Sequence, residues 1–131
     1  MATILIIDDH DDLRDTLVAI LEDEGYATLA TGDGISGVHV FGAARPDVVV
    51  VDMIMPKSNG LDTIREILAI DPQARIVAMS GGSLVSGDYY LDVAEALGAM
   101  QLLPKPFEAE DLVRAIETCL GSPPALAISA A

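Results

Sequence analysis

Short apolar runs alternate along this chain with segments in which apolar residues recur every three or four positions. The runs predict buried strands, and the three-to-four-residue period predicts amphipathic helices. The predicted strands cover residues 3–7, 27–31, 48–53, 75–80 and 100–103. The predicted helices cover residues 13–24, 35–44, 61–70, 89–97 and 108–120. Strand and helix therefore alternate along the whole chain.

Several of the predicted strands are nearly continuous aliphatic runs, which is typical of strands covered on both faces. Strand–helix units in series indicate an α/β fold, a doubly wound five-stranded parallel sheet with helices on both faces. Asp11 or Asp12 is expected to cap the first helix, and Gly25 is expected to end it. We expect one domain over residues 1–121 and a flexible tail over 122–131.

With 131 residues, 51% of them hydrophobic, the chain can bury the core of one ordinary domain. The single cysteine, Cys119, excludes an internal disulfide and is interpreted as a small buried residue. The apolar run at residues 4–7 is too short for a signal peptide, and no run approaches the ~18 residues of a membrane span. We therefore expect a cytoplasmic protein without a membrane partner.

The charge of the chain is strongly negative, with a formal net charge of −14 from 21 acidic and 7 basic residues. The basic residues are scattered singly: Arg14, Arg45, Lys57, Arg65, Arg75, Lys105 and Arg114. A polyanion would be repelled by this charge, and no basic helix offsets the repulsion. Binding to nucleic acid is therefore not expected.

Polar side chains stand where the predicted strands end. Asp8 and Asp9 follow the first strand, and Asp52 ends the third. Ser80 ends the fourth strand, and Lys105 follows the fifth. In a doubly wound sheet, ligands bind outside the carboxyl ends of the strands. Clustered carboxylates favour a hard divalent cation such as Mg²⁺, and beside it the Asp52 carboxylate can act as a nucleophile toward a phosphoryl group.

Five motifs carry these residues in a fixed order. They are Ile-Leu-Ile-Ile-Asp-Asp at 4–9, Val-Val-Val-Val-Asp-Met-Ile-Met-Pro at 48–56, Asn-Gly-Leu-Asp at 59–62, Ala-Met-Ser at 78–80 and Lys-Pro-Phe at 105–107. Over roughly residues 3 to 120, the chain resembles the receiver domains of two-component response regulators, in particular the stand-alone, chemotaxis-regulator-like ones. The resemblance implies a flavodoxin-like sheet with strand order 2-1-3-4-5.

The resemblance also implies a metal site. Asp8 and Asp9 would form an acidic pocket for Mg²⁺, with Asp9 the more direct ligand. Asp52 would be the third acid and the phosphoryl acceptor. The backbone carbonyl of Ile54 would complete the metal shell.

By the same resemblance, Ser80 is the switching hydroxyl and Lys105 contacts the phosphoryl group. The Lys105–Pro106 peptide is expected to be cis. A histidine kinase or histidine phosphotransfer protein would supply the phosphoryl group, and a separate protein target would read the result. The chain would assist only its own phosphorylation and dephosphorylation and would not otherwise be an enzyme. A diffusible effector and a relay intermediate both stay open.

Three features depart from the commonest receiver pattern. Leu102 stands where the family usually has a switching Tyr or Phe, so Tyr89 or Tyr90 is a hypothetical substitute in signal transmission. A longer, glycine-rich stretch at 81–87 is either a rearranging loop or a neutral insertion. Ile54 and Gly82 occupy positions that tune the lifetime of the phosphoryl group, and neither can orient a water, so we expect slow self-hydrolysis.

Other functions fit the sequence less well. The Gly-x-Gly-x-x-Gly pattern at Gly32, Gly34 and Gly37 follows the second strand, whereas a dinucleotide site belongs after the first, so these are interpreted as turn and helix-packing glycines. A haloacid-dehalogenase-like phosphatase would need a second Asp where Ile54 stands. His10 is interpreted as an exposed loop residue and not as a metal ligand. The main alternative is a degenerate receiver that binds a partner constitutively without phosphorylation.

Overall fold

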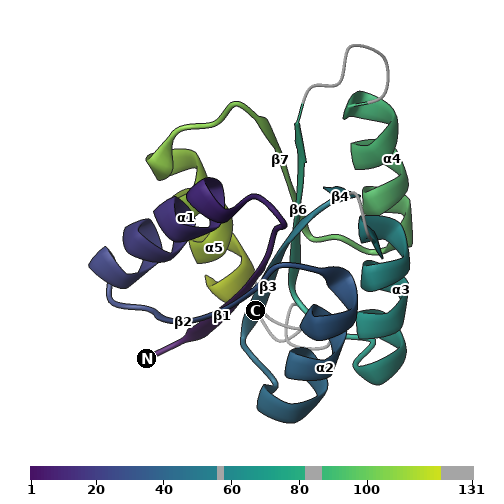
Figure 1. Ribbon diagram of the computed structural model, residues 1–131, viewed down its shortest axis with the longest axis horizontal. Coiled ribbons are helices and arrows are strands. Elements are labelled where there is room, and N and C mark those ends of the chain that lie inside the picture. Colours follow the sequence, from purple (N-terminus) through teal and green to yellow (C-terminus); the bar gives the residue numbers. More distant parts are fainter. Residues whose placement is uncertain (56–57, 82–86, 122–131) are drawn as a thin grey trace, which may run out of the picture.

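A five-stranded parallel sheet forms the centre of the molecule (Figure 1). The computed structural model describes residues 1–55, 58–81 and 87–121, so the predicted tail lies outside the described residues. The strands are β1 (Thr3–Ile7), β2 (Ala27–Thr31), β3 (Val48–Asp52), β6 (Ile76–Gly81) and β7 (Gln101–Lys105). They lie in the order β2-β1-β3-β6-β7, all parallel. Counted in chain order this is 2-1-3-4-5, which confirms the expected topology.

Helices cover both faces of this sheet. They are α1 (Asp11–Asp23), α2 (Gly34–Ala44), α3 (Gly60–Ile70), α4 (Gly87–Leu97) and α5 (Ala109–Gly121). Figure 1 shows α1 and α5 on one face and α2, α3 and α4 on the other. This arrangement follows from right-handed crossovers that change direction at β1, and it leaves the carboxyl ends of all five strands at one edge.

Alternation along the strands divides the core into two layers. Leu5 and Ile7 of β1 pack toward α2 and α3, whereas Ile4 and Ile6 pack toward α1 and α5. All four side chains are fully buried. Because β1 is covered on both faces, it reads as an unbroken apolar run and not as an alternating one.

β1 and β2 have the predicted boundaries, the other predicted elements differ from theirs by one or two residues at an end, and two short strands were missed. β4 (Ile54–Met55) and β5 (Ser58–Asn59) form a small antiparallel pair directly after β3. Two-residue strands have no hydrophobic period, so the sequence pattern cannot signal them. The fifth sheet strand extends to Lys105, because β-pairing with β6 continues to Gly81.

The predicted cap of α1 was wrong. His10 is the N-cap, with extended backbone (φ −86°, ψ 106°), and its Nδ1 accepts a hydrogen bond from the amide of Leu13. Asp11 and Asp12 lie inside the first turn, where the positive end of the helix dipole stabilises their negative charges. Gly25 ends the helix as predicted, with a φ of 93° that suits glycine.

Cys119 of α5 is fully buried against the sheet, as the sequence predicted. Burial raises the pKa of its thiol to about 11.

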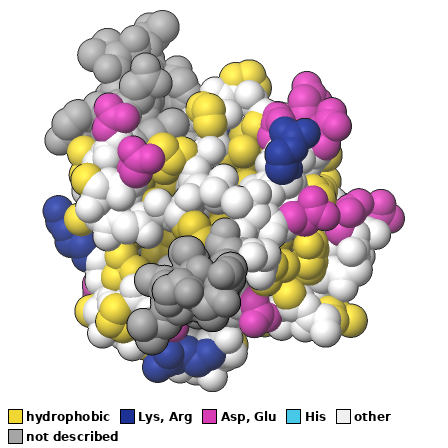
Figure 2. Space-filling model, turned by 180° about the vertical axis from the view of Figure 1, so that it is seen from behind, with side chains coloured by type: hydrophobic (Ala, Val, Ile, Leu, Met, Phe, Trp, Pro, Cys, Tyr) yellow, Lys and Arg dark blue, Asp and Glu magenta, His cyan; other side chains and the backbone are white. Residues whose placement is uncertain are grey.

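None of the helices in the described ranges has both the length and the apolar character of a membrane span. On the face drawn in Figure 2, Lys and Arg side chains lie in small separate groups among acidic and apolar ones.

The close approach of α2 to β1 explains a glycine of the Gly-x-Gly-x-x-Gly pattern. A Cβ on Gly37 would lie 2.4 Å from Cδ1 of the fully buried Ile7. The helix-packing interpretation of Gly37 is therefore confirmed.

Gly37→Ala should lower the free energy of unfolding by about 1–3 kcal/mol, because the added methyl group overpacks the core. Gly42→Ala is the matched control on the same helix, since its Cβ would meet nothing closer than Ile70 Cδ1 at 3.9 Å. The control should be neutral or stabilise by ~0.5–1 kcal/mol through helix propensity. Urea unfolding of the three proteins measures both effects, and equal losses in the two variants would contradict the packing argument.

Candidate functional site

Three carboxylates meet at the carboxyl edge of the sheet. β1 and β3 pair in register, with Ile7 opposite Val51, so Asp8 and Asp52 follow as neighbours. Asp9 completes the group, and one oxygen from each of the three carboxylates lies within 4.8 Å of the others. The sheet thus brings together all three acids that the sequence singled out.

Two of these acids are buried. Asp8 is 0% exposed and Asp52 5% exposed, whereas Asp9 is open to solvent. Asp8 Oδ1 accepts a hydrogen bond from the amide of His10 at 2.8 Å. Asp8 Oδ2 accepts no hydrogen bond from the described part of the chain. A buried carboxylate oxygen without a donor is costly, so this oxygen needs a cation.

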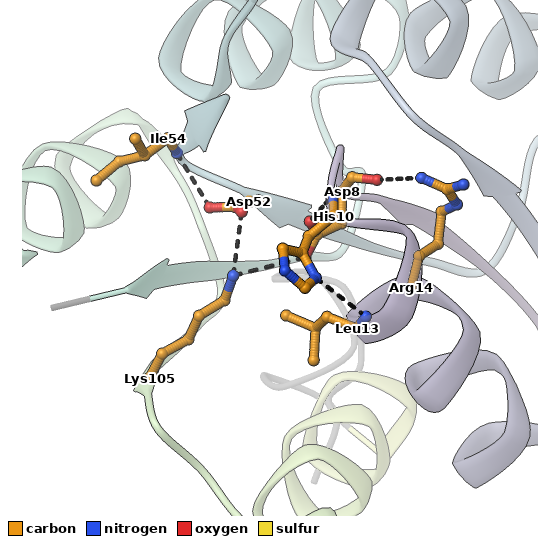
Figure 3. Close-up of polar contacts among 7 residues, drawn as sticks. All are labelled: Asp8, His10, Leu13, Arg14, Asp52, Ile54 and Lys105. Atoms are coloured by element: carbon orange, nitrogen blue, oxygen red, sulfur yellow. Dashed lines mark hydrogen bonds and ion pairs between the residues drawn. The ribbon is translucent and has the colours of Figure 1, made fainter. Parts of the chain in front are cut away.

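Lys105 supplies the compensating charge (Figure 3). Its Nζ donates to Asp52 Oδ2 at 3.0 Å and lies 3.5 Å from Asp8 Oδ2. The ammonium comes from the end of β7, two strands away from β3, and the Lys105–Pro106 peptide is cis as expected. One ammonium thus bridges two buried carboxylates.

Burial raises the pKa of the Asp52 carboxyl above its ordinary value. The hydrogen bond from the Ile54 amide to Asp52 Oδ1 (3.0 Å) and the ammonium of Lys105 act in the opposite direction. The charge of Asp8 adds a smaller upward contribution. Desolvation outweighs the favourable contacts, so the site holds Asp52 as a poorly solvated carboxylate.

The backbone after Asp52 is held by the start of α3. The amide of Gly60 donates to the carbonyl of Met53 at 3.3 Å. A Cβ on Gly60 would lie 2.5 Å from Met53 Cα and 2.6 Å from the Asp52 carbonyl oxygen. Only glycine fits this contact, which fixes the turn that carries Ile54. The sequence placed Gly60 in the Asn-Gly-Leu-Asp motif but did not indicate that close backbone contacts require a glycine there.

Ser80 lies on the strand next to Asp52. Asp52 pairs with Met79, so Ser80 is one residue further along β6. Ser80 is 2% exposed, and its Oγ has no hydrogen-bond partner among the residues that the structure describes. A buried hydroxyl without a partner beside the acids is available to donate to a ligand oxygen.

The acids fit a divalent cation. They offer only hard oxygen donors. Asp8 Oδ2 accepts no hydrogen bond from the described residues, and a bound cation would compensate for the missing donor. Asp8, Asp9 and Asp52 are therefore the residues that could hold Mg²⁺. The carbonyl of Ile54 as a further ligand stays a prediction.

Other sequence predictions have mixed outcomes. Leu102 is partly buried and packs against the core layer shared with α4. Residues 82–86 and the side chains of Tyr89 and Tyr90 lie outside the described residues, so the predictions on them stay untested. His10 is exposed, as expected. Arg14 also donates a hydrogen bond to the Asp8 carbonyl, a contact that no local sequence pattern signals.

Comparisons with known proteins agree with this geometry. The response regulator receiver domain family matches residues 4–117. The transcriptional regulator NtrC of Azospirillum brasilense is 36% identical over 95% of this chain, which spans only 26% of NtrC. The chemotaxis protein CheY of Thermotoga maritima is 34% identical, covering 86% of this chain and 92% of CheY. The crystal structure of a receiver domain protein from Clostridium thermocellum has a TM-score of 0.85 and 32% identity, covering 92% and 94% of the two chains.

The raised pKa of Asp52 has a consequence for stability. A carboxyl whose folded pKa is raised stabilises the fold at low pH, and this contribution is lost as pH rises through the folded pKa. In the presence of a chelator, Asp52→Asn should therefore be more stable than the native protein at neutral pH, because the desolvated charge of Asp52 is removed. The gain should shrink as the pH falls through the folded pKa of Asp52 toward the ordinary Asp value of 3.8.

Urea unfolding at several pH values measures this difference. Asp12→Asn is the control, since it removes one negative charge from an exposed position of α1. It should change the free energy of unfolding by no more than about 0.5 kcal/mol. Loss of stability in Asp52→Asn at neutral pH would show that the ion pair with Lys105 outweighs the desolvation of Asp52.

Proposed function

This chain belongs to the response regulator receiver domain family, and on that premise we propose that it accepts a phosphoryl group on Asp52 in a Mg²⁺-dependent reaction. The donor is a histidine kinase or a histidine phosphotransfer protein, and the result is read by a separate protein. The observation that carries the proposal is the buried Asp52 carboxylate, held between the Ile54 amide and the Lys105 ammonium. The chain acts as a signalling module and assists only reactions of its own phosphoryl group.

The proposed transfer moves phosphorus from nitrogen to oxygen. A carboxylate oxygen of Asp52 attacks the phosphorus of a phosphohistidine, the new P–O bond forms and the P–N bond breaks. The imidazole leaves on the donor protein. Mg²⁺, held by Asp8, Asp9 and Asp52, would offset negative charge on the phosphoryl oxygens.

Lys105 and Ser80 would bind the phosphoryl group once it is attached to Asp52. Lys105 Nζ already lies at hydrogen-bond distance from Asp52, so its positive charge is in place when the phosphoryl group adds negative charge there. Ser80 Oγ, buried and without a described partner, can donate to a phosphoryl oxygen. Satisfying that hydroxyl would draw the end of β6 toward Asp52, which is the proposed switching movement.

The surface offers a place for a donor protein beside the acceptor. Leu13, Pro106 and Phe107 line an apolar hollow of about 430 Å³ that includes Lys105. A hollow next to the nucleophile allows a donor protein to seat an apolar side chain while its histidine reaches Asp52. This arrangement favours a macromolecular donor over a small metabolite.

A second groove is the proposed output surface. It runs along β7 and α5, measures about 400 Å³ and is lined in part by Leu102, Pro104, Phe107 and Arg114. Leu102 joins this groove to the core beside α4, so movement of β6 and β7 can change the groove. Scattered basic residues offer no continuous stripe for a nucleic acid, and the proposed target is a protein in the cytoplasm.

Beryllofluoride or acetyl phosphate with Mg²⁺ tests the proposal. The native protein should gain the mass of one phosphoryl group from acetyl phosphate, and EDTA or Asp52→Asn should abolish the gain. Beryllofluoride should shift amide signals around Ser80 and Lys105. Asp12→Asn, the matched exposed acid, should react as the native protein does. Confirmed Mg²⁺ binding without any modification or shift would favour the alternative, a degenerate receiver that binds its partner constitutively.

The lifetime of the phosphoryl group should be long, because Ile54, the residue two positions after the acceptor, is apolar and cannot orient a water. Ile54 is 39% exposed, so a polar side chain there would reach solvent and the site together. Ile54→Asn should speed loss of the phosphoryl group on the order of tenfold, or ~1.4 kcal/mol in the barrier. Ile35→Asn, at an exposed position of α2, is the control and should have no effect. A native half-life of only seconds contradicts the prediction.

A further inference from the structure

Arg14 makes a contact that the proposed chemistry does not use. It comes from the first turns of α1, and its guanidinium turns back toward the end of β1 (Figure 3). Nη1 donates to the carbonyl oxygen of Asp8 at 2.8 Å, and Nη2 pairs with Asp11 Oδ1 at 2.6 Å. The Arg14 side chain is only 21% exposed, whereas that of Asp11 is 81% exposed. The buried end of this arrangement is therefore the contact with Asp8.

The carbonyl that accepts the hydrogen bond from Arg14 belongs to the peptide that joins the two pocket acids, Asp8 and Asp9. The orientation of that peptide plane sets the directions in which the two carboxylates leave the backbone. The amide of Asp8 is held by the carbonyl of Thr31 at 3.1 Å, and Asp8 Oδ1 by the amide of His10. The hydrogen bond from Arg14 holds the carbonyl side of the same peptide.

Gly32 provides the space for this guanidinium. A Cβ at Gly32 would lie 3.3 Å from Arg14 Nη1 and 3.9 Å from Cζ. Gly32 is exposed, and its φ lies outside the left-handed region, so backbone strain does not require a glycine there. What distinguishes the position is that the Arg14 guanidinium lies against it.

We propose that Arg14, seated against Gly32, is a positioning residue that orients the Asp8–Asp9 peptide so that both carboxylates can bind a divalent cation. This inference rests on the metal site of the proposed function. It also assigns a role to the first glycine of the Gly-x-Gly-x-x-Gly pattern, which belongs to neither a dinucleotide site nor the packing of α2. Removing a residue that hydrogen-bonds to metal ligands typically lowers metal affinity about 10–100-fold.

The charge of Arg14 gives the test a decisive sign. A guanidinium near a cation site repels the cation, so a purely electrostatic role predicts tighter Mg²⁺ binding when Arg14 is neutralised. A positioning role predicts weaker binding. The two explanations therefore differ in direction and not merely in size.

The experiment compares Mg²⁺ dissociation constants for the native protein, Arg14→Met, Gly32→Leu and the double variant, measured by amide shifts in an Mg²⁺ titration. Arg14→Met should raise the dissociation constant about tenfold or more. Gly32→Leu displaces the guanidinium without changing charge, and it should raise the dissociation constant in the native background only. In the Arg14→Met background it should add nothing, because the group it displaces is absent.

Two further variants separate positioning from folding. Arg14→Lys keeps the charge and loses the planar guanidinium, so its dissociation constant should lie between those of native and Arg14→Met. Asp11→Asn removes the exposed ion pair and keeps the contact with Asp8, so it should change the dissociation constant by no more than about threefold. Urea unfolding in EDTA reports any general loss of stability, which should not track the Mg²⁺ affinities.

Tighter or unchanged Mg²⁺ binding in Arg14→Met, or additive effects of the two substitutions, would overturn the proposal. Either result leaves the metal site itself intact, since the native protein still binds Mg²⁺. Absence of Mg²⁺-induced shifts in the native protein is a different outcome. It removes the metal site from the proposed function and this inference with it.

Discussion

The structure depends on one electrostatic constraint, the burial of the Asp8 and Asp52 carboxylates side by side at the carboxyl edge of the sheet. Removing two carboxylates from water is costly, and like charges add to the cost. In the described structure the ammonium of Lys105 offsets only part of this cost by bridging the two acids. The site is therefore under electrostatic tension, and a divalent cation or a change at Asp52 alters its charge balance directly.

The fold places the two buried acids, Lys105 and Ser80 next to one another. Buried aliphatic strands bring Asp8 and Asp52 together by register, and the turn held by Gly60 fixes the backbone amide that faces Asp52. Lys105 arrives from β7, so the same ammonium links the acid site to the strand that lines the proposed output groove. Ser80 lies between them on β6, buried and without a described hydrogen bond. In the proposed function, a change at Asp52 would reach the groove through these two adjacent strands.

Leu102 shows how this chain departs from the common receiver pattern without losing its site. The side chain packs into the apolar layer beside α4 and also lines the groove along α5. An aliphatic residue in this place cannot act as an aromatic rotamer switch. In the proposed function, the connection between site and groove would instead use the backbone pairing of β6 with β7, in which Ala78 lies opposite Leu102 and Ser80 opposite Pro104.

The five sheet strands and the three acids could be predicted from the amino-acid sequence, because they depend on local hydrophobic period and on residues placed at strand ends. The strand order was predicted only through the family resemblance. Element boundaries, the β4–β5 pair and the His10 cap depended on pairing and backbone geometry that short segments do not specify. The packing of distant elements brings Lys105 between Asp8 and Asp52 and places Arg14 against Gly32, where Arg14 donates a hydrogen bond to the Asp8 carbonyl. Lys105 and Gly32 lie 18 or more positions from their partners in the chain, and Arg14 reaches back past the start of its own helix, so the packing of whole elements sets these contacts.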